Sequence, residues 1–565
     1  QESYCGVTTP LTFSFARAAY ASVYEQTMRA LGFAEPTIAA HAGMLRNMLG
    51  LHAGRVYYNI NNWYRALLLL PSFGRNKADM EAMMGLDEPV DFVEDQRLSL
   101  LEKLRLLPGM LLTAARLLLA FRRLKSRDVE QFMQRFEAKI ARVDRTTLSS
   151  LGVSALMDHV AFLQREVVGE WHVPIINDIF VMVATGRVRR LVERATGPGA
   201  ARDAAVNALL GGEEGIESVE PTRWLMRLAR EAGSDAALVR ALRRDDITLD
   251  ALRQDFAPFA SRVSAYIERY GDRVMGELKL ETRSLRDDPS FVFRVLRNFL
   301  DRPDLDADAQ MRHERERRAE AEREMRGRLG GFAWRRLAHS LRNARQGIKA
   351  RERMRLARTR LFGLFRDVYL AIGARLHAAG RLDSARDVFW LTTDELQEFC
   401  EGRATTTNLA ALAAVRRAEF AAFESREMPD RFDTVGPAGF AQFVRPAREA
   451  ADTSAATLRG TGCSAGVVEA ELAVILRPDD DLAINGRILT TVRTDPGWAP
   501  LFPSAAGVLI ERGSTLSHSA VLARELGIPA VVGVQNLLKI VRQGERVRLD
   551  GATGIVQRLD AAVGQ

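Results

Sequence analysis

One histidine, His518, stands where a strand-to-helix turn would present it to a phosphate group. The apolar run Gly507–Ile510 predicts a strand, and a Gly-Ser-Thr turn follows it. The spacing from His518 onward predicts a short helix with Ser517 as its N-cap. A helix N-terminus supplies unpaired N–H groups and a positive dipole end, which favour phosphate and a neutral, nucleophilic imidazole. The pattern therefore predicts a histidine that carries a phosphoryl group; the alternative is a structural histidine in a βα turn.

The residues around this histidine could hold the phosphoryl oxygens. Arg512 and Arg524 flank it in the sequence, and arginine binds phosphate oxygens bidentately. Arg524 stands nearly two helical turns further on, so Arg512 is expected to have the better reach. Gly513, Ser517 and Ser519 complete the predicted phosphate-stabilising residues.

This block resembles the mobile (swivelling) phosphohistidine domain of enzymes related to phosphoenolpyruvate synthase and pyruvate phosphate dikinase. The matching residues are Gly513, Ser517–Ala520, Ala523–Glu525, Gly527–Ala530 and Asp550–Gly554. Two positions depart from the dikinase pattern, because Ser514 replaces a glycine and Leu516 replaces a threonine. The leucine is similar to the rifampicin phosphotransferase branch. The resemblance thus implies a phosphohistidine and an acceptor other than pyruvate.

The composition changes along the chain and predicts two domains. Residues 1–450 show mostly helical periodicity, whereas short β-branched runs and turns dominate after about residue 460. We expect a large, mainly α-helical domain of the substrate-binding type over 1–450. A small α/β swivelling phosphohistidine domain is expected over 451–565. A flexible linker is predicted at 448–460.

The N-terminal region has its own, patchier resemblance. Its short blocks look like the acceptor-binding domain of rifampicin phosphotransferase-like proteins; they are Gly6–Thr12, Gly54–Asn59, Asn62–Tyr64, Arg381–Asp383 and Asp387–Leu391. Candidate acceptor-pocket residues are Tyr57, Tyr58, Asn59, Trp63, Tyr64 and His172. The aromatic residues could equally be core anchors and the histidine structural. The turn Asp495–Trp498 is placed beside the phosphohistidine by the resemblance.

Composition indicates an ordinary globular protein. The chain has 565 residues with 47% hydrophobic and 27% charged residues, and its three cysteines are far apart, so neither disulfides nor a zinc site is predicted. This favours a cytoplasmic protein. No apolar run, including Met110–Phe121, is long enough to span a bilayer, so no membrane partner is expected.

Residues 311–360 carry most of the positive charge, with 17 Lys/Arg against 6 Asp/Glu. A long solvated helix is the first interpretation of this run. The alternative is a basic face that steers an anionic partner. Nucleic acid is not expected, because aromatic residues are not interleaved with the charges.

The resemblance also implies parts that the sequence does not show. Related enzymes place ATP and Mg²⁺ on an ATP-grasp domain, and no such domain is recognised ahead of Gly6. We therefore expect an ATP-grasp domain or subunit as partner and a small molecule as acceptor. No metal site is predicted in this chain itself.

Three functions remain open from the sequence. The first is a phosphotransferase in which His518 carries phosphate from ATP to an acceptor in the helical domain. The second is an ATP-driven condensing or ligase-type enzyme with the same intermediate, or a phosphoenolpyruvate synthase-like protein. The third is a non-catalytic carrier or binding protein.

Overall fold

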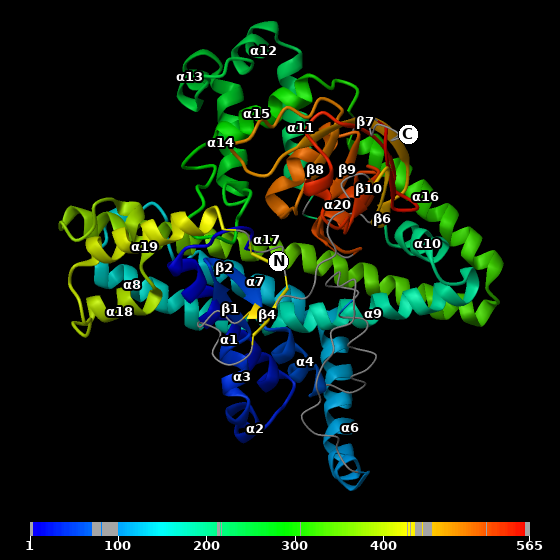
Figure 1. The fold of residues 1–565 in the computed structure, drawn as a ribbon, viewed down its shortest axis with the longest axis horizontal. Coiled ribbons are helices and arrows are strands. Elements are labelled where there is room, and N and C mark those ends of the chain that lie inside the picture. The colour runs from blue at the N-terminus through cyan, green and yellow to red at the C-terminus, as the bar shows by residue number, and fades with distance from the viewer. Residues whose placement is uncertain are drawn as a thin grey trace.

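A computed structural model describes residues 4–69, 81, 100–211, 215, 217, 219–305, 307–426, 428–429, 431–434, 443–444, 455–515 and 517–559. Within these ranges the chain forms a helical body, a smaller group of helices and a C-terminal α/β domain (Figure 1).

The longest helix, α17 (Gly331–Ala378), is the axis of the helical body. It lies along α9 (His172–Thr196), and both helices cross beneath the C-terminal domain in Figure 1. Apolar side chains of α17 recur at helical spacing and are buried, including Leu361, Phe365 and Ile372. The N-terminal helix α1 (Pro10–Ala30) packs on α9, and one extended core cluster joins these helices.

The other elements of the helical body surround this axis. Those at the N-terminal end are α2 (Glu35–Ala40), α3 (Ala42–Arg46), β1 (Leu49–His52), β2 (Arg55–Tyr58), α4 (Ile60–Leu68), α6 (Leu100–Arg123), η1 (Leu124–Asp128), α7 (Val129–Ile140), η2 (Leu148–Ser150), α8 (Val153–Phe162), η3 (Leu163–Val167) and η4 (Val168–Glu170). Those further along are α10 (Ala200–Leu210), α16 (Ala307–Arg328), η5 (Ala385–Trp390), α18 (Thr393–Cys400), α19 (Leu409–Glu424), β3 (Asp433–Thr434) and β4 (Phe443–Val444).

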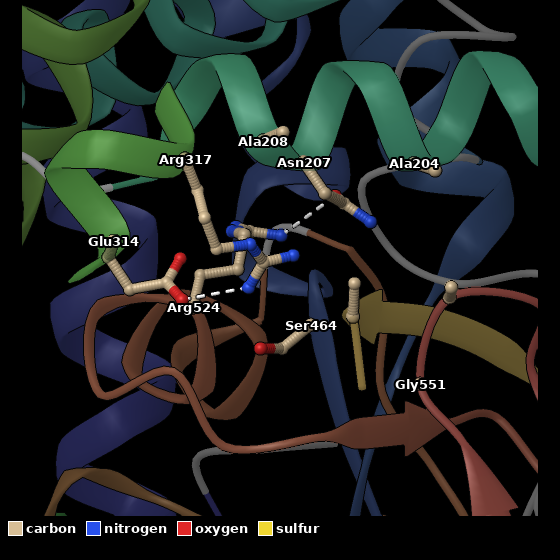
Figure 2. Close-up of a pocket in the computed structure, with 10 residues that line it drawn as sticks. Ala204, Asn207, Ala208, Glu314, Arg317, Ser464, Arg524 and Gly551 are labelled. Carbon is tan, nitrogen blue, oxygen red and sulfur yellow. Dashed lines mark hydrogen bonds and ion pairs between the residues drawn. The ribbon is translucent and has the colours of Figure 1, made fainter. Parts of the chain in front are cut away.

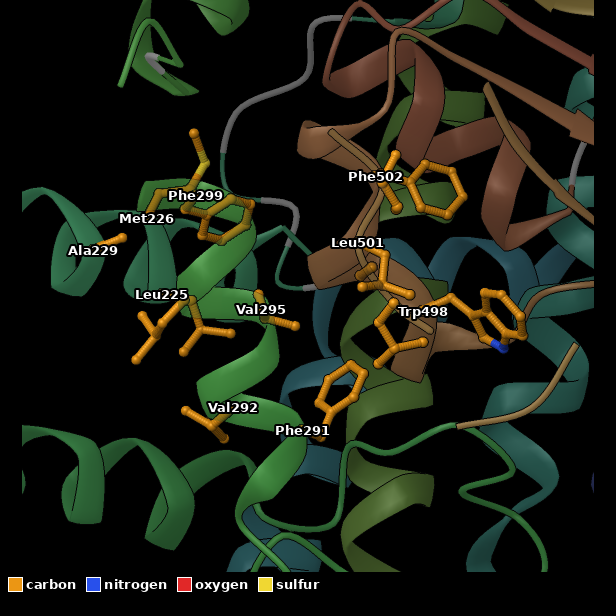
Figure 3. Close-up of a cluster of buried hydrophobic side chains, with 14 of the residues drawn as sticks. Leu225, Met226, Ala229, Phe291, Val292, Val295, Phe299, Trp498, Leu501 and Phe502 are labelled. Carbon is orange, nitrogen blue, oxygen red and sulfur yellow. The ribbon is translucent and has the colours of Figure 1, made fainter. Parts of the chain in front are cut away.

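A smaller group of helices stands beside the C-terminal domain. Its members are α11 (Glu220–Gly233), α12 (Ala236–Leu242), α13 (Leu249–Asp255), α14 (Ala257–Tyr270) and α15 (Ser290–Leu300). Their buried apolar side chains share one cluster with the C-terminal domain, in which α15 faces the 3₁₀ segment η7 (Pro496–Ser504) (Figure 3). The two groups are therefore joined by a common core.

The C-terminal domain is built on one eight-stranded mixed sheet. Its strands lie in the order β5-β12-β11-β7-β8-β9-β10-β6. The bounds are β5 (Thr457–Arg459), β6 (Thr461–Ser464), β7 (Val467–Val474), β8 (Ile488–Thr491), β9 (Gly507–Ile510), β10 (Ala530–Val532), β11 (Arg546–Asp550) and β12 (Ile555–Arg558). Strands β7 to β10 run parallel, and the helices α20 (His518–Glu525) and α21 (Leu537–Ile540) follow β9 and β10.

The predicted fold class is confirmed: a large helical region precedes a small α/β domain. The strand predicted at Gly507–Ile510 is β9 with the same bounds, and the β-branched runs after about residue 460 supply the other strands of the sheet. The predicted linker lies largely outside the described residues, so the domain boundary stays a prediction. One helical stretch, Val153–Thr196, is long and apolar enough to cross a membrane, but 56% of its most apolar window is buried inside the protein, as in a core helix.

Candidate active site around His518

The strand-to-helix turn forms as its residue types require. Strand β9 spans Gly507–Ile510, and His518 is the first residue of α20. The side chain of Ser517 accepts a hydrogen bond from the Ala520 N–H at 3.3 Å, which caps the helix. Leu516, the position that distinguishes the branches, lies outside the described residues.

The ring of His518 is buried against a carboxylate rather than in apolar packing. Its Nδ1 lies 3.1 Å from Oε2 of Glu352, which belongs to α17 of the helical body. Both side chains are almost inaccessible, with 2% and 1% exposed. Its Nε2 is also buried and has no hydrogen-bond partner among the described residues. The ring is thus held by one nitrogen, and the other nitrogen is available for chemistry.

The charges around Glu352 settle which atom carries the ring proton. Burial by itself would raise the pKa of Glu352, but Arg355, His518 and Arg351 together hold that pKa far below its usual value. Arg355 contacts the same carboxylate, with Nη1 3.1 Å from Oε1. An ionised carboxylate can only accept, so Nδ1 of His518 carries the proton and donates it. The neutral ring therefore has its lone pair on Nε2.

A second group of buried polar side chains lies one to two turns further along α17. Thr359 donates to Glu277 at 2.8 Å, and Glu277 pairs with Arg273 at 3.4 Å. Nε and Nη2 of Arg273 are buried without hydrogen-bond partners among the described residues. Asp495 of the C-terminal domain accepts the Gly276 N–H at 2.6 Å. Positions 352, 355 and 359 share one face of α17. This face carries Glu352 and Arg355, and it contacts Glu277 through Thr359.

Asp495 is a buried carboxyl group with a raised pKa. Burial, followed by the charge of Glu277, raises its pKa to about 7. Asp495 accepts the Gly497 N–H at 2.9 Å as the cap of η7, and η7 packs against α20. The turn Asp495–Trp498 thus lies against the helix that begins with His518.

The predicted phosphate-stabilising residues differ in their surroundings. Arg524 is buried in a small pocket and donates to the Thr515 carbonyl at 2.9 Å and to Asn207 at 3.0 Å (Figure 2). Its guanidinium therefore joins the two domains instead of facing His518. Figure 2 also shows Arg317 beside it, paired with Glu314 at 2.8 Å.

The other four predicted residues stay near the turn. Ser517 and Ser519 lie 3.0 Å apart through their hydroxyls, next to the cap. A Cβ on Gly513 would approach Ser517 Oγ at 3.5 Å, so this glycine stands close to the helix N-terminus. Arg512 keeps a third of its side chain exposed and has Nε 3.6 Å from Glu511.

The sequence did not single out Glu352, Arg355, Arg273 or Glu277. Glu352 lies inside the basic run 311–360, and the interpretation of that whole run as a solvated helix is wrong for its second half. From residue 331 the run belongs to α17, whose apolar and polar side chains enter the core. One signal was present: Glu352 is the only acid between residues 331 and 360.

The predicted acceptor residues fall into separate environments. Tyr64 is fully buried and donates to Glu81 at 2.7 Å, while Asn59 caps α4. Tyr57 points elsewhere and donates to the Pro429 carbonyl at 2.7 Å. His172 lines a different cavity between α6, α7 and α9, with Asp128 and Arg135 on its walls, and its Nδ1 is buried without a partner among the described residues. These four do not form one pocket.

Tyr58 and Trp63 instead join Tyr20 and Tyr24 of α1. The hydroxyls of Tyr20 and Tyr58 lie 2.7 Å apart, and Trp63 packs edge-on against Tyr24 and Tyr58. We call these four residues the aromatic cluster. Burial raises the pKa of Tyr20, which Arg358 of α17 partly offsets. Arg358 therefore lies within electrostatic reach of the aromatic cluster.

Two protein-family models match the regions that form this site. Residues 483–554 match the family model of the mobile domain of PEP-utilising enzymes, and residues 172–352 match that of the rifampicin phosphotransferase fourth domain. Residues 483–554 are therefore similar to a PEP-utilising mobile domain. The matched regions contain both members of the buried pair, since one includes His518 and the other ends at Glu352. The resemblance predicted from the sequence is confirmed.

Individual relatives agree with this assignment. Rifampicin phosphotransferase from a Streptomyces species is 32% identical over 52% of this chain and 34% of its own length. An uncharacterized protein of Mycobacterium tuberculosis is 28% identical over 77% of this chain and 46% of its own length. The prodigiosin synthesizing transferase of Serratia marcescens is 26% identical over 63% of this chain and 41% of its own length. The chain thus spans between a third and a half of the length of these relatives.

Proposed function

We propose that this chain is the carrier and acceptor part of a phosphotransferase with a phosphohistidine intermediate. His518 would take a phosphoryl group from ATP and deliver it to a small molecule in the helical body. ATP and Mg²⁺ would be held by an ATP-grasp unit outside the 565 residues. The observation that carries the proposal is the orientation of His518: Nδ1 is bound to buried Glu352, and Nε2 is buried without a partner.

The two nitrogens have different roles in the proposed step. The lone pair of Nε2 attacks phosphorus, and the bond from phosphorus to the leaving phosphate oxygen breaks. The proton on Nδ1 stays in place, so the ring becomes a phosphorylated imidazolium whose charge faces Glu352. By family resemblance the β-phosphate is the one transferred: attack at this phosphorus displaces AMP, and water then cleaves the β–γ bond and releases inorganic phosphate. An acceptor hydroxyl then attacks the phosphoryl group, the P–N bond breaks and the neutral ring is restored, while the hydroxyl proton is released to solvent.

The structure has the two domains docked, which corresponds to the acceptor half of the cycle. His518 is inaccessible to a nucleotide in this arrangement, so phosphorylation requires the C-terminal domain to leave α17. Splitting the reaction between two sites explains why a mobile carrier is needed.

The aromatic cluster is the proposed acceptor wall. It combines four rings with three hydroxyls, and Arg358 of α17 is close enough to Tyr20 to lower its pKa. Such a wall suits a flat, partly apolar acceptor, because rings bury large area while their polar tips bind hydroxyls. Tyr58→Phe should weaken acceptor binding, whereas Tyr57→Phe, which removes the hydroxyl that donates to the Pro429 carbonyl, serves as the matched control.

The central claim can be tested without knowing the nucleotide partner. Potassium phosphoramidate phosphorylates accessible histidine directly, and ³¹P NMR distinguishes Nε2 from Nδ1 adducts. The protein should acquire one acid-labile phosphoryl group on Nε2 of His518, and His518→Ala should lose it while its other seven histidines are unchanged. His518 meets the reagent only when the C-terminal domain undocks, so the labelling is followed to its plateau. An Nδ1 adduct at that plateau, or no adduct on His518, would contradict the proposal.

Phosphoryl-driven condensation is the second candidate function, favoured by the similarity to the prodigiosin synthesizing transferase. Both reactions pass through the same phosphohistidine. Product analysis separates them, because condensation releases inorganic phosphate with a joined product and phosphotransfer yields a phosphate ester. A protein that acts only as a binding carrier would form neither.

A further inference from the structure

A cleft in the helical body shares no lining residue with the site around His518 or with the aromatic cluster. It has a volume of about 280 Å³ and is lined by residues of α1, α6, η1, α7 and α9. Small-molecule sites are commonly clefts of about 300–1,000 Å³, so this one has room for a small organic molecule. We call it the His172 cleft, after the one histidine that lines it.

Half of the residues that line the His172 cleft are apolar. They come from α1, α6, η1 and α9 and are Ala30, Ala120, Leu124, Val173 and Ile176. All except Ala30 are buried, so the packing of the helical core holds them in place. Fixed apolar surface of this kind favours the hydrocarbon part of a ligand.

The other half is polar and carries more positive than negative charge. Its members are Arg123, Asp128, Gln131, Arg135 and His172. The single acid, Asp128, already has a cation beside it, because Nε of Arg127 lies 3.5 Å from its carboxylate. Arg135 donates to Glu170 through Nε at 3.0 Å, which leaves its Nη groups as further donors. The polar half therefore favours an anionic group.

His172 adds a polar atom that the protein leaves unsatisfied. Its Nδ1 is buried and has no hydrogen-bond partner among the described residues. Burial lowers the pKa of the His172 ring below its usual value, so the ring is neutral at pH 7. Buried polar atoms are nearly always paired, and an unpaired one at the wall of a cleft indicates a partner that is still to come.

The backbone at the cleft has an unusual form. Between α6 and α7 the segment η1 (Leu124–Asp128) is a π-helical turn. Such turns are rare and occur frequently at functional sites. Both ends of η1 line the cleft, one with the apolar Leu124 and the other with the charged Asp128. The π-helical turn therefore contributes to both halves of the cleft.

We propose that the His172 cleft binds a small organic anion, namely a compact apolar molecule with one carboxylate. The Nη groups of Arg135 would bind the carboxylate, and charge-assisted bonds of this kind are strong. The apolar residues would cover the hydrocarbon body. A cation fits less well, because the cleft offers it one acid that is already paired and two arginines. The site goes beyond the proposed phosphotransferase and does not depend on it.

Isothermal titration calorimetry of the 565-residue protein tests the proposal with two probes of the same shape. 1-Naphthoate carries the carboxylate, and 1-naphthamide replaces it with a neutral group. Naphthoate should bind, and naphthamide should bind about tenfold more weakly or worse, because its amide cannot form the charged contact. Arg135→Gln should weaken naphthoate binding about tenfold and leave naphthamide binding unchanged.

A second arginine provides the matched control. Arg253 is also exposed and also pairs with one acid, Asp250, so Arg253→Gln removes an equal charge far from the cleft in the sequence and should leave naphthoate binding unchanged. Lys139 still contacts Glu170 in Arg135→Gln, and thermal melts establish that both variants are folded.

Three outcomes would overturn the proposal. Equal binding of naphthoate and naphthamide would show that no charged contact forms. Equal weakening by Arg135→Gln and Arg253→Gln would show that naphthoate responds only to the overall positive charge. If the wild type binds neither probe, the cleft holds only water or other residues of this chain. None of these outcomes changes the labelling of His518, so the proposed function is tested separately.

Discussion

Replacing Glu352 by glutamine tests whether a charge holds the two domains together. Glutamine keeps the size of the side chain and can still accept from Nδ1 of His518. It removes the charge that faces both His518 and Arg355, each 3.1 Å from the carboxylate. Because the pKa of Glu352 is held low in the folded protein, its stabilising effect is present above its unfolded pKa and is lost only in acid. The experiment therefore belongs near pH 7, where the wild-type carboxylate is ionised.

The expected magnitude follows from the His518 contact alone, because Arg355 belongs to α17 like Glu352 and keeps its contact when the domains separate. Hydrogen bonds to charged groups contribute about 1.5–3 kcal/mol each, against about 1 kcal/mol for neutral ones. Exchanging this charged contact for a neutral one should cost roughly 0.5–2 kcal/mol of docking free energy. Since each 1.4 kcal/mol is tenfold, the fraction of undocked protein should rise about two- to thirtyfold.

The assay measures how often His518 reaches solvent. Diethyl pyrocarbonate modifies histidine rings only when they are accessible, and peptide mass spectrometry reports the rate at His518. With fast redocking, that rate follows the undocked fraction, so Glu352→Gln should accelerate it by the same factor. Glu469→Gln is the matched control, because this acid on β7 is half exposed and pairs with Arg548 at 3.4 Å on the surface. An unchanged rate in Glu352→Gln would refute the reasoning and leave apolar packing as the cause of burial.

Three further predictions concern the same interface and its surroundings. Gly497→Ala should undock the domains or strongly destabilise the protein, because the added Cβ would stand 2.1 Å from the Val274 carbonyl carbon. Gly327→Ala is the control, since its added Cβ would meet nothing within 4 Å. Urea denaturation compares the two variants. Because the pKa of Asp495 is raised to about 7 in the folded protein, its protonated carboxyl stabilises the fold at low pH. This stabilisation is lost as the pH rises from 3.8 toward 7. Asp495→Asn should flatten the pH dependence of the urea midpoint over this interval. His172→Gln should leave phosphoramidate labelling of His518 unchanged, because His172 lines a separate cavity.

The sequence was informative wherever structure depends on neighbouring residues. The N-cap Ser517, the start of α20 at His518 and the strand β9 follow from local rules and are observed. The partner of His518 could not be found in this way, because Glu352 is 166 positions away and its contact depends on how the domains dock. The basic composition around Glu352 resembled a solvated helix, since charge density alone does not show that one face of α17 enters the core.

The same reason explains the mixed outcome for the aromatic residues. Tyr57 and Tyr58 are adjacent in β2, and adjacent strand residues face opposite sides. Tyr58 therefore meets Tyr20, whereas Tyr57 packs against Phe432. Aromatic residues that are close in sequence therefore lie in different surroundings, because strand geometry divides them.

The shared core limits how the C-terminal domain can move. Phe299 and Leu501 belong to one buried cluster, and Asn298 of α15 donates to the Leu482 carbonyl at 2.7 Å (Figure 3). If residues 451–565 moved alone, this apolar surface would meet water at considerable cost. If helices α11–α15 moved with them, the cluster would stay intact, and the contacts with the helical body, including those with α10, α16 and α17, would break.

Hydrogen exchange of Glu352→Gln distinguishes the two movements. Joint movement predicts faster exchange in α20 and in the loop 271–276, with α15 and η7 as protected as in the wild type. Separate movement predicts that α15 loses protection together with α20, because its cover is removed at each opening. We expect joint movement, since the core that α15 shares with the C-terminal domain is apolar while the surface facing α17 around His518 is held by charges that water can replace. Equal loss of protection in α15 and α20 would show that the linker alone is the hinge.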